Sequence, residues 1–390
     1  MGNVPHLRFP EFSGEWKKCK LGDLCNVLMC KRILVSQTNT EDGVPFYKIG
    51  TIGSTPDAYI SKELFDDYKV KYNYPRKGEV MITCAGTVGK CVVYDGEDAY
   101  FQDSNIVWID NPTQYISNGF LFHLLSKVDW RKLNSTTIIR IYNDDLRNLK
   151  MSYPRKEEQQ KISHLLSLLD ERIATQNKII EDLKKLKCAI IEKVLNGNNA
   201  NNLRLGDVGS YIRGLTYSSD DVVEYNSTLV MRSNNIVNGS LLDYQNNVVS
   251  VNKQISQEQQ LQDGDIIICM ANGSSALVGK SSFYDGKCIS PITVGAFCGI
   301  YRSKTAIAKW LFQTNRYRRY IWNSLQGGNG AIANLNSEDI LRMSFPLPDK
   351  QTAERCIKLL SSLESLIESN ISLCSKFSQQ KEYLLRQMFI

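Results

Sequence analysis

The sequence predicts an α+β protein with two similar globular domains, separated by two long helices that form an antiparallel coiled coil. The chain would then be an internal repeat with pseudo-two-fold symmetry. Three observations predict this fold: a set of motifs occurs twice in the same order, each copy mixes strand-like and turn-like runs, and each copy ends in a long helical segment. The length of 390 residues also exceeds what one core usually holds.

The motifs of the first copy return about 190 positions later in the second copy. The residues CKLGDL, KGEVMITCAG, VGKCVVYDG and NDDLRNLKMSYP (from positions 19, 77, 88 and 143) correspond to LRLGDV, DGDIIICMANG, VGKSSFYDG and NSEDILRMSFP (from positions 203, 263, 278 and 336). Because several distinct motifs keep one order, a duplicated module is favoured over a short unit stacked many times.

The first part of each copy has the pattern of strands joined by turns. Short apolar or alternating runs such as EVMITCAG and NIVWI are separated by Gly, Pro, Asn and Asp. A proline then precedes a charged segment of helical periodicity that contains neither proline nor an internal glycine in the first copy. We therefore predict globular domains at 1–156 and 198–348, and long helices at 157–197 and 349–390.

Each long helix has an apolar seam that advances in steps of three and four residues, which is typical of a coiled coil. The two seams are Leu166, Leu169, Ile173, Gln176, Ile180, Leu183, Lys187, Ile190, Val194 and Leu360, Leu363, Ile367, Asn370, Cys374, Phe377, Lys381, Leu384, Met388. Polar residues interrupt both seams at the same two steps. Because a buried polar group costs stability but fixes register, we expect Gln176, Lys187, Asn370 and Lys381 to set the helix pairing. Solvent-facing positions on ordinary amphipathic helices are the alternative.

Composition indicates an ordinary globular chain, with 42% apolar and 23% charged residues and a net charge of +6. The sequence lacks an apolar run long enough for a membrane span and a signal-peptide core, so we expect a cytoplasmic protein without membrane contact. Eleven cysteines contain no CxxC pair and are joined by only three histidines, so we predict no metal site.

The common catalytic patterns are absent from the sequence. The VGK segments lack the first glycine of a phosphate-binding P-loop, and neither the cofactor loop nor the catalytic tetrad of an adenine methyltransferase is present. The histidines form no arrangement with Ser, Cys or a carboxylate that both copies share, as a duplicated active site would require. We predict no catalytic residue and no cofactor on this chain.

A basic, aromatic stretch followed by a small polar loop precedes the last motif of each copy: SKVDWRKLNSTTIIR at 126–140 and TNRYRRYIWNSLQGGNGA at 314–331. Such residues suit double-stranded DNA, because cations neutralise phosphates while amides, hydroxyls and guanidinium groups read base edges. The phosphate candidates are Arg131, Lys132, Arg316, Arg318 and Arg319, and the base-reading candidates are Asn134, Thr136, Arg140, Gln326 and Asn329. A solvated helix face that ends in a loop is the alternative.

The opening VPHLRFPEFSGEWKKCKLGDL, the two VGK patterns, the NDDL…MSYP segment and the EEQQKI…LLDERI helix together resemble the specificity (S) subunit of bacterial type I restriction-modification systems. The resemblance covers essentially the whole chain. It implies that the globular parts are target recognition domains, each reading one half of a split DNA target, that the helices fix the spacer between the halves, and that the subunit has no catalytic activity. It also makes Lys90 and Lys280, in the VGK turns, candidate contacts to the DNA backbone.

The same resemblance implies the partners of the chain. Two modification (M) subunits, which carry S-adenosylmethionine, would dock against the helices and domains and methylate one adenine in each half-target, with restriction (R) subunits as optional further partners. The second copy departs from the pattern, because KQTAERCI replaces the EEQQKI start of the helix. A non-catalytic coiled-coil scaffold whose globular ends bind proteins is the alternative function.

Overall fold

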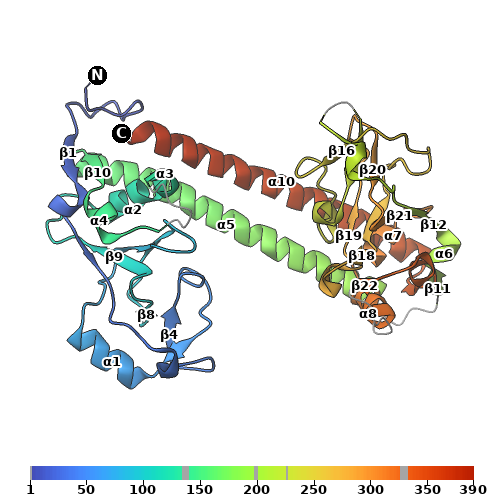
Figure 1. Cartoon of the computed structure of the whole chain (residues 1–390), viewed down its shortest axis with the longest axis horizontal. Helices are drawn as coiled ribbons and strands as arrows, with labels where there is room; N and C mark the ends of the chain where they lie inside the picture. Colours follow the sequence, from blue (N-terminus) through green and yellow to red (C-terminus); the bar gives the residue numbers. More distant parts are fainter. Residues whose placement is uncertain (1, 134–139, 197–200, 225–226, 326–332) are drawn as a thin grey trace. The chain divides into compact units, whose positions relative to one another are not determined.

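The computed structural model describes residues 2–133, 140–196, 201–224, 227–325 and 333–390 (Figure 1). The chain forms two compact units. Unit 1 comprises Met1–Asn177 and Ser372–Ile390, and unit 2 comprises Lys178–Ile371. Both divisions fall inside a long helix, so each unit contains one globular part and a portion of both long helices.

Unit 1 contains two four-stranded sheets and one two-stranded sheet, with strand orders β2-β9-β6-β7, β3-β5-β4-β8 and β1-β10. Its strands are β1 Lys17–Lys20, β2 Asn26–Leu28, β3 Thr38–Asn39, β4 Val44–Tyr47, β5 Tyr59–Ile60, β6 Val80–Thr83, β7 Cys91–Val93, β8 Tyr100–Phe101, β9 Ile106–Asp110 and β10 Lys150–Tyr153. Its helices are α1 Lys62–Lys71, α2 Asn118–Lys127, α3 Trp130–Leu133, α4 Asn143–Arg147 and the first part of α5 Lys156–Leu195.

Unit 2 repeats this plan with sheets β12-β21-β17-β19-β15, β13-β16-β14-β20 and β11-β23, to which it adds the pair β18-β22. Its strands are β11 Asn201–Arg204, β12 Gly209–Arg213, β13 Val222–Val223, β14 Thr228–Met231, β15 Ser240–Leu241, β16 Val249–Val251, β17 Ile266–Cys269, β18 Ala271–Asn272, β19 Ser281–Phe283, β20 Ile292–Val294, β21 Cys298–Ser303, β22 Ala333–Asn334 and β23 Ser344–Leu347. Its helices are α6 Leu205–Val208, α7 Ala308–Leu311, α8 Asn315–Leu325, α9 Ser337–Leu341 and the first part of α10 Lys350–Met388.

The strand pairings confirm the internal repeat. The antiparallel order β2-β9-β6-β7 corresponds to β12-β21-β17-β19, and one parallel pair occurs at the same place in the second sheet of each unit, β4 with β8 and β14 with β20. The α+β class and the duplicated plan predicted from the motif order are therefore correct.

Two of the repeated motifs pack against each other in both units. The turn after the first strand places Gly22 against the backbone of α4, where an added Cβ would lie 3.0 Å from the Arg147 carbonyl oxygen. Gly206 has the same relation to α9, at 3.0 Å from the Leu341 carbonyl oxygen. Glycine is favoured at both places because a Cβ would press on the neighbouring backbone. This contact explains why the LGD and the NDDL or NSED segments recur together.

The long helices α5 and α10 pair antiparallel within each unit. In unit 1, Asp170 pairs with Lys381, and the Cys374 thiol donates to the Asn177 side-chain oxygen at 3.4 Å. In unit 2, Lys187 pairs with Glu364 at 3.4 Å. The residue numbers on one helix rise as those on the other fall, and every residue of the two predicted seams is buried or half-buried. The predicted coiled coil is therefore correct.

Each unit is completed by the far end of a long helix. Met388 and Phe389 lie in the core of unit 1, where the Phe389 ring is 4.8 Å from the ring of Phe120. Ile191 and Leu195 lie in the core of unit 2. Burial of these apolar ends anchors both helices to the globular part at which they finish.

A buried histidine makes the stability of unit 1 sensitive to pH. His123 on α2 is fully buried, and its Nδ1 lies 4.0 Å from a carboxylate oxygen of Asp170. Burial, helped by the nearby cation of Lys381, lowers its pKa to about 4, although the Asp170 carboxylate acts in the opposite direction. An unfolded histidine takes up its proton near pH 6.5, so the unfolded state binds more protons than the folded state between these values. The contribution of neutral His123 to the free energy of unfolding should therefore be complete above pH 6.5. The free energy of unfolding should fall by up to about 3 kcal/mol as the pH drops toward 4.

Thermal or urea unfolding between pH 7 and pH 4.5 measures this loss. The His123→Gln variant, whose amide does not titrate, should show a weaker dependence on pH over the same range. An identical slope in the two proteins would contradict the assignment to His123.

In the described part of the chain, no helix combines the length and apolar character needed to cross a lipid bilayer. The described residues also include no group of three or more His, Cys, Asp or Glu side chains placed to hold a metal ion.

Candidate nucleic-acid interface

The VGK turn of each unit is pressed against the basic stretch that follows in sequence. Gly89 and Gly279 have φ values of +84° and +79°, which favour glycine. A Cβ on Gly89 would lie 2.3 Å from the Trp130 ring at the start of α3, and a Cβ on Gly279 would lie 2.6 Å from Ile321 on α8. The two glycines thus place the VGK turn against the basic stretch in both units, and in unit 2 Lys280 lines a cleft together with residues of α8.

In unit 2 the basic helix α8 is fixed at several points. The Tyr317 hydroxyl donates to the Gly279 carbonyl at 2.7 Å, and the Tyr320 hydroxyl donates to the Ser344 carbonyl at 2.9 Å. At its start, the Asn315 backbone N–H donates to the Glu192 carboxylate at 2.5 Å. Hydrogen bonds along its first two turns therefore tie α8 to the VGK turn, to β23 and to α5, as the positioning of a binding surface requires.

The polar loop after each basic helix returns to the sheet at an equivalent place. The Ile141 N–H donates to the Cys84 carbonyl at 2.9 Å in unit 1, and the Leu335 N–H donates to the Met270 carbonyl at 2.8 Å in unit 2. The candidate base-reading residues Asn134, Thr136, Gln326 and Asn329 belong to these loops and lie outside the described residues.

The remaining candidates of unit 1 differ in their surroundings. Arg131 and Lys132 are exposed, and Lys132 pairs with Asp129 at 3.3 Å. The Lys90 ammonium donates to the Ile52 carbonyl at 2.5 Å. Arg140 is half-buried, donates to the Ser104 carbonyl at 3.1 Å and has its guanidinium 5.9 Å from the centre of the Tyr142 ring. The surface cations Arg131 and Lys132 suit phosphate contact, while Arg140 is held in one orientation.

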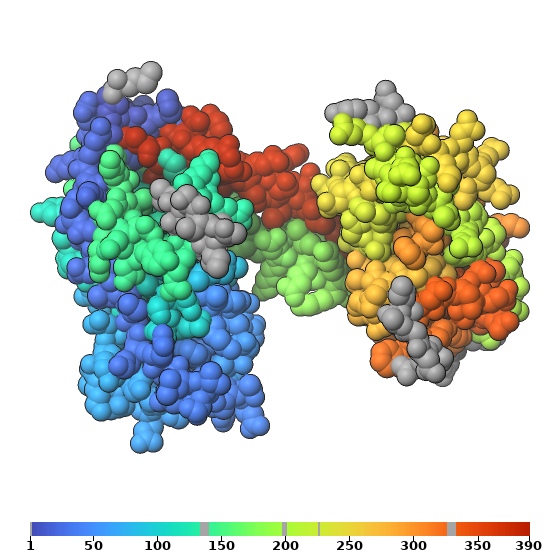
Figure 2. Space-filling model, in the orientation of Figure 1, coloured from blue at the N-terminus to red at the C-terminus, as the bar shows by residue number. Residues whose placement is uncertain are grey.

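In unit 2, α8 presents Arg318 and Arg319 to solvent, and orange side chains of this part of the chain reach the surface in Figure 2. Arg316 is half-buried, and its shielded Nε finds no hydrogen-bond acceptor among the described residues. A shielded donor without a partner is uncommon in native structures. Lys280 is half-buried in the turn below the helix.

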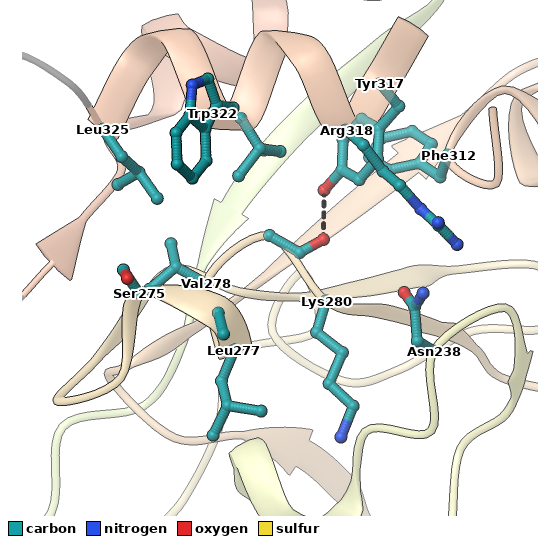
Figure 3. A pocket seen from close by; sticks show the side chains of 13 residues that line it. Asn238, Ser275, Leu277, Val278, Lys280, Phe312, Tyr317, Arg318, Trp322 and Leu325 are labelled. Atoms are coloured by element: carbon teal, nitrogen blue, oxygen red, sulfur yellow. Dashed lines mark hydrogen bonds between the residues drawn. The ribbon is translucent and has the colours of Figure 1, made fainter. Parts of the chain in front are cut away.

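A cleft of about 420 Å³ lies between the VGK turn of unit 2 and α8. In Figure 3, Trp322 and Leu325 face Ser275, Leu277 and Val278 across it, with Lys280 and Arg318 farther along. Trp322 is 66% exposed and is not among the interface residues predicted from the sequence. The spacing of apolar residues could have identified Trp322. Tyr317 and Ile321 are four residues apart and lie on the buried face of α8, so Trp322 lies on its outer face.

The four predicted helix-pairing residues lie on the less exposed side of their helices. Gln176 and Lys187 are 7% and 8% exposed, and Asn370 and Lys381 are half-buried. Lys187 and Lys381 each pair with an acid of the partner helix, and the Asn370 amide donates to the Leu366 carbonyl of its own helix at 2.6 Å. That these residues set the helix pairing stays a prediction.

Comparisons with known proteins agree with this architecture. The model of the type I restriction modification DNA specificity domain matches the chain twice, at residues 13–185 and 198–373. The solved S subunit of a type I restriction-modification system from M. genitalium has a similar fold, with a TM-score of 0.62 at 15% identity over 99% of both chains.

Curated relatives resemble parts of the chain. A Haemophilus influenzae protein described as a type I restriction enzyme specificity subunit is 49% identical over 167 residues, which is 43% of each chain. The EcoKI specificity subunit of Escherichia coli is 29% identical over 171 residues, covering 40% of this chain and 35% of that protein. These matches therefore span less than half of either relative. Since the family model covers most of both halves, the chain belongs to the type I restriction modification DNA specificity domain family.

Proposed function

We propose that this chain is the DNA specificity subunit of a type I restriction-modification complex, in which each globular part reads one half of a split target. The observation that carries the proposal is the repeated pairing of a VGK turn with a basic helix, since both units build this arrangement with different side chains on its surface. Two related surfaces of different composition suit a target whose two halves differ in sequence.

The proposed role of the helices is to set the spacer between the half-targets and to dock two M subunits. The chain itself would contribute no catalytic group and no cofactor, and S-adenosylmethionine would be bound by the M subunits. Restriction subunits are further partners of this proposal. For the domain limits, we propose recognition domains at 1–156 and 198–348 and conserved helices at 157–197 and 349–390.

Co-expression of this chain with the M subunit of its own genome, followed by mapping of methylated adenines in the host DNA, tests the proposal. We expect one two-part motif with a fixed spacer. Exchange of residues 1–156 for the same domain of a relative should change one half of that motif and leave the other half and the spacer unchanged, because the second reader is untouched.

Two outcomes would oppose this function. An intact complex that methylates no adenine, or that marks one continuous short site, contradicts two-part reading. Binding of the M-loaded complex to a duplex should also weaken steeply as salt rises, since phosphate contacts release counterions. An affinity that does not change with salt would favour the protein-binding scaffold instead.

A further inference from the structure

We propose that Trp322 stacks against a nucleobase of the target DNA in the cleft between α8 and the VGK turn of unit 2. This inference rests on the proposed function and adds a specific contact to it. The cleft has a volume of about 420 Å³, and Trp322 lies on its helix side (Figure 3).

The lining of this cleft suits nucleic acid. Lys280 and Arg318 supply cations, whereas none of the described residues that line the cleft carries a carboxylate. Trp322 and Leu277 supply exposed apolar surface, at 66% and 40% exposure. Aromatic rings next to cations hold the bases and backbone of single strands, and in a duplex a side chain can reach the face of a base by wedging into a base step that it partly unstacks.

The helix that carries Trp322 packs on the VGK turn, and this contact determines the direction in which the indole projects. Tyr317 is 2% exposed and bonds to the turn through its hydroxyl, and Ile321 packs directly on Gly279. A ring presented by a fixed helix loses little conformational entropy on binding.

The two units place different chemistry at this position. Trp130 packs on Gly89 as Ile321 packs on Gly279, so the next residues, Arg131 and Trp322, occupy equivalent positions. Both are exposed. The first unit thus offers a guanidinium where the second offers an indole, as expected of readers with different targets.

Trp322 can be observed separately from the other tryptophans of the chain. Of the five tryptophans, Trp16, Trp108, Trp130 and Trp310 are at most 4% exposed. A small quencher such as acrylamide therefore reaches Trp322 selectively. Incorporation of 5-hydroxytryptophan into this chain alone, followed by assembly with ordinary M subunits, keeps the signal distinct from the tryptophans of the partners.

The test measures acrylamide quenching of this labelled complex before and after addition of a duplex that carries the target identified by methylation mapping. We expect the duplex to protect the exposed signal. A duplex with the half-site of unit 2 scrambled should protect it less. The Trp322→Ala variant should bind the target about 10- to 100-fold more weakly, and Trp322→Phe should retain most of the affinity.

Ile289, which is fully exposed in the same unit, provides the matched control, since Ile289→Ala should leave the affinity unchanged. Unchanged quenching with the duplex bound would overturn the stacking while leaving the proposed function intact. Protection that arises when M subunits bind, before DNA is added, would also overturn it, because a protein would then be the occupant. Failure of the complex to bind or methylate any DNA would instead refute the proposed function itself.

Discussion

Replacement of Glu364 by alanine is expected to lower the free energy of unfolding by about 3–5 kcal/mol, because the loss of a shared partner leaves two shielded lysines without their carboxylate. Glu364 on α10 is 9% exposed. It accepts from Lys187 of α5 at 3.4 Å and also pairs with Lys309 of α7. The Lys187 ammonium keeps one further bond, to the Gly239 carbonyl at 3.1 Å.

Urea unfolding of Glu364→Ala beside Glu368→Ala measures this effect. Glu368 is one turn further along the same helix and exposed, so its removal controls for helix propensity and net charge. Equal losses of unfolding free energy in the two variants would show that the ion pairs of Glu364 contribute little to stability. The Glu364→Gln variant keeps the shape of the side chain but not its charge. Its free energy of unfolding should lie between those of the unaltered protein and the alanine variant.

A second large loss, also of about 3–5 kcal/mol, is expected for Arg8→Ala. The Arg8 guanidinium donates two bonds of 2.7 Å to the carboxylate of Glu158, near the start of α5. Glu158 is fully buried, and the Trp16 indole N–H is its other donor, at 3.3 Å. Without Arg8, a buried negative charge would keep only this one weak donor.

The same unfolding experiment contains its own control. Glu11 and Lys161 form an exposed ion pair between the same segments of the chain, and exposed pairs contribute little to stability. Glu11→Ala should therefore unfold nearly as the unaltered protein does. A loss for Arg8→Ala no greater than that of Glu11→Ala would contradict the importance of the buried pair.

The acid partners of the seam lysines extend the relation between the two helices. Asp170 precedes Lys187 on α5 by the same number of residues as Glu364 precedes Lys381 on α10. Each acid pairs with the lysine of the other helix, Asp170 with Lys381 and Glu364 with Lys187. A third side chain lies beside the acid of each pair, and it differs between the units. It is the neutral ring of His123 in unit 1 and the cation of Lys309 in unit 2.

Local pattern was enough to predict the duplicated plan and the coiled coil. Heptad spacing identifies the helix face that is buried, and motif order identifies a repeated module, because both are properties of neighbouring residues. The start of α10 follows equally local rules, since the Asp349 carboxylate before the helix accepts from the Thr352 N–H at 3.0 Å.

Contacts between distant segments could not be predicted in this way. The Arg8–Glu158 pair joins residues 150 positions apart, and no periodicity links them. The exposure of Trp322 depends on which face of α8 meets Gly279, a contact that the string NRYRRYIWNSL alone does not reveal. Of the predicted interface, the structure brings the VGK turns beside the basic helices, while the loop candidates lie outside the described residues.

The packing of Met388 and Phe389 into unit 1 has a consequence for synthesis on the ribosome. Unit 2 is one continuous stretch of sequence, Lys178–Ile371, so all of its core residues have been synthesised before those two are added. Domains generally fold in the order of their translation. Here the part of the chain that is translated first closes its core last, and its unfinished apolar surface must stay soluble while the whole of unit 2 is being made.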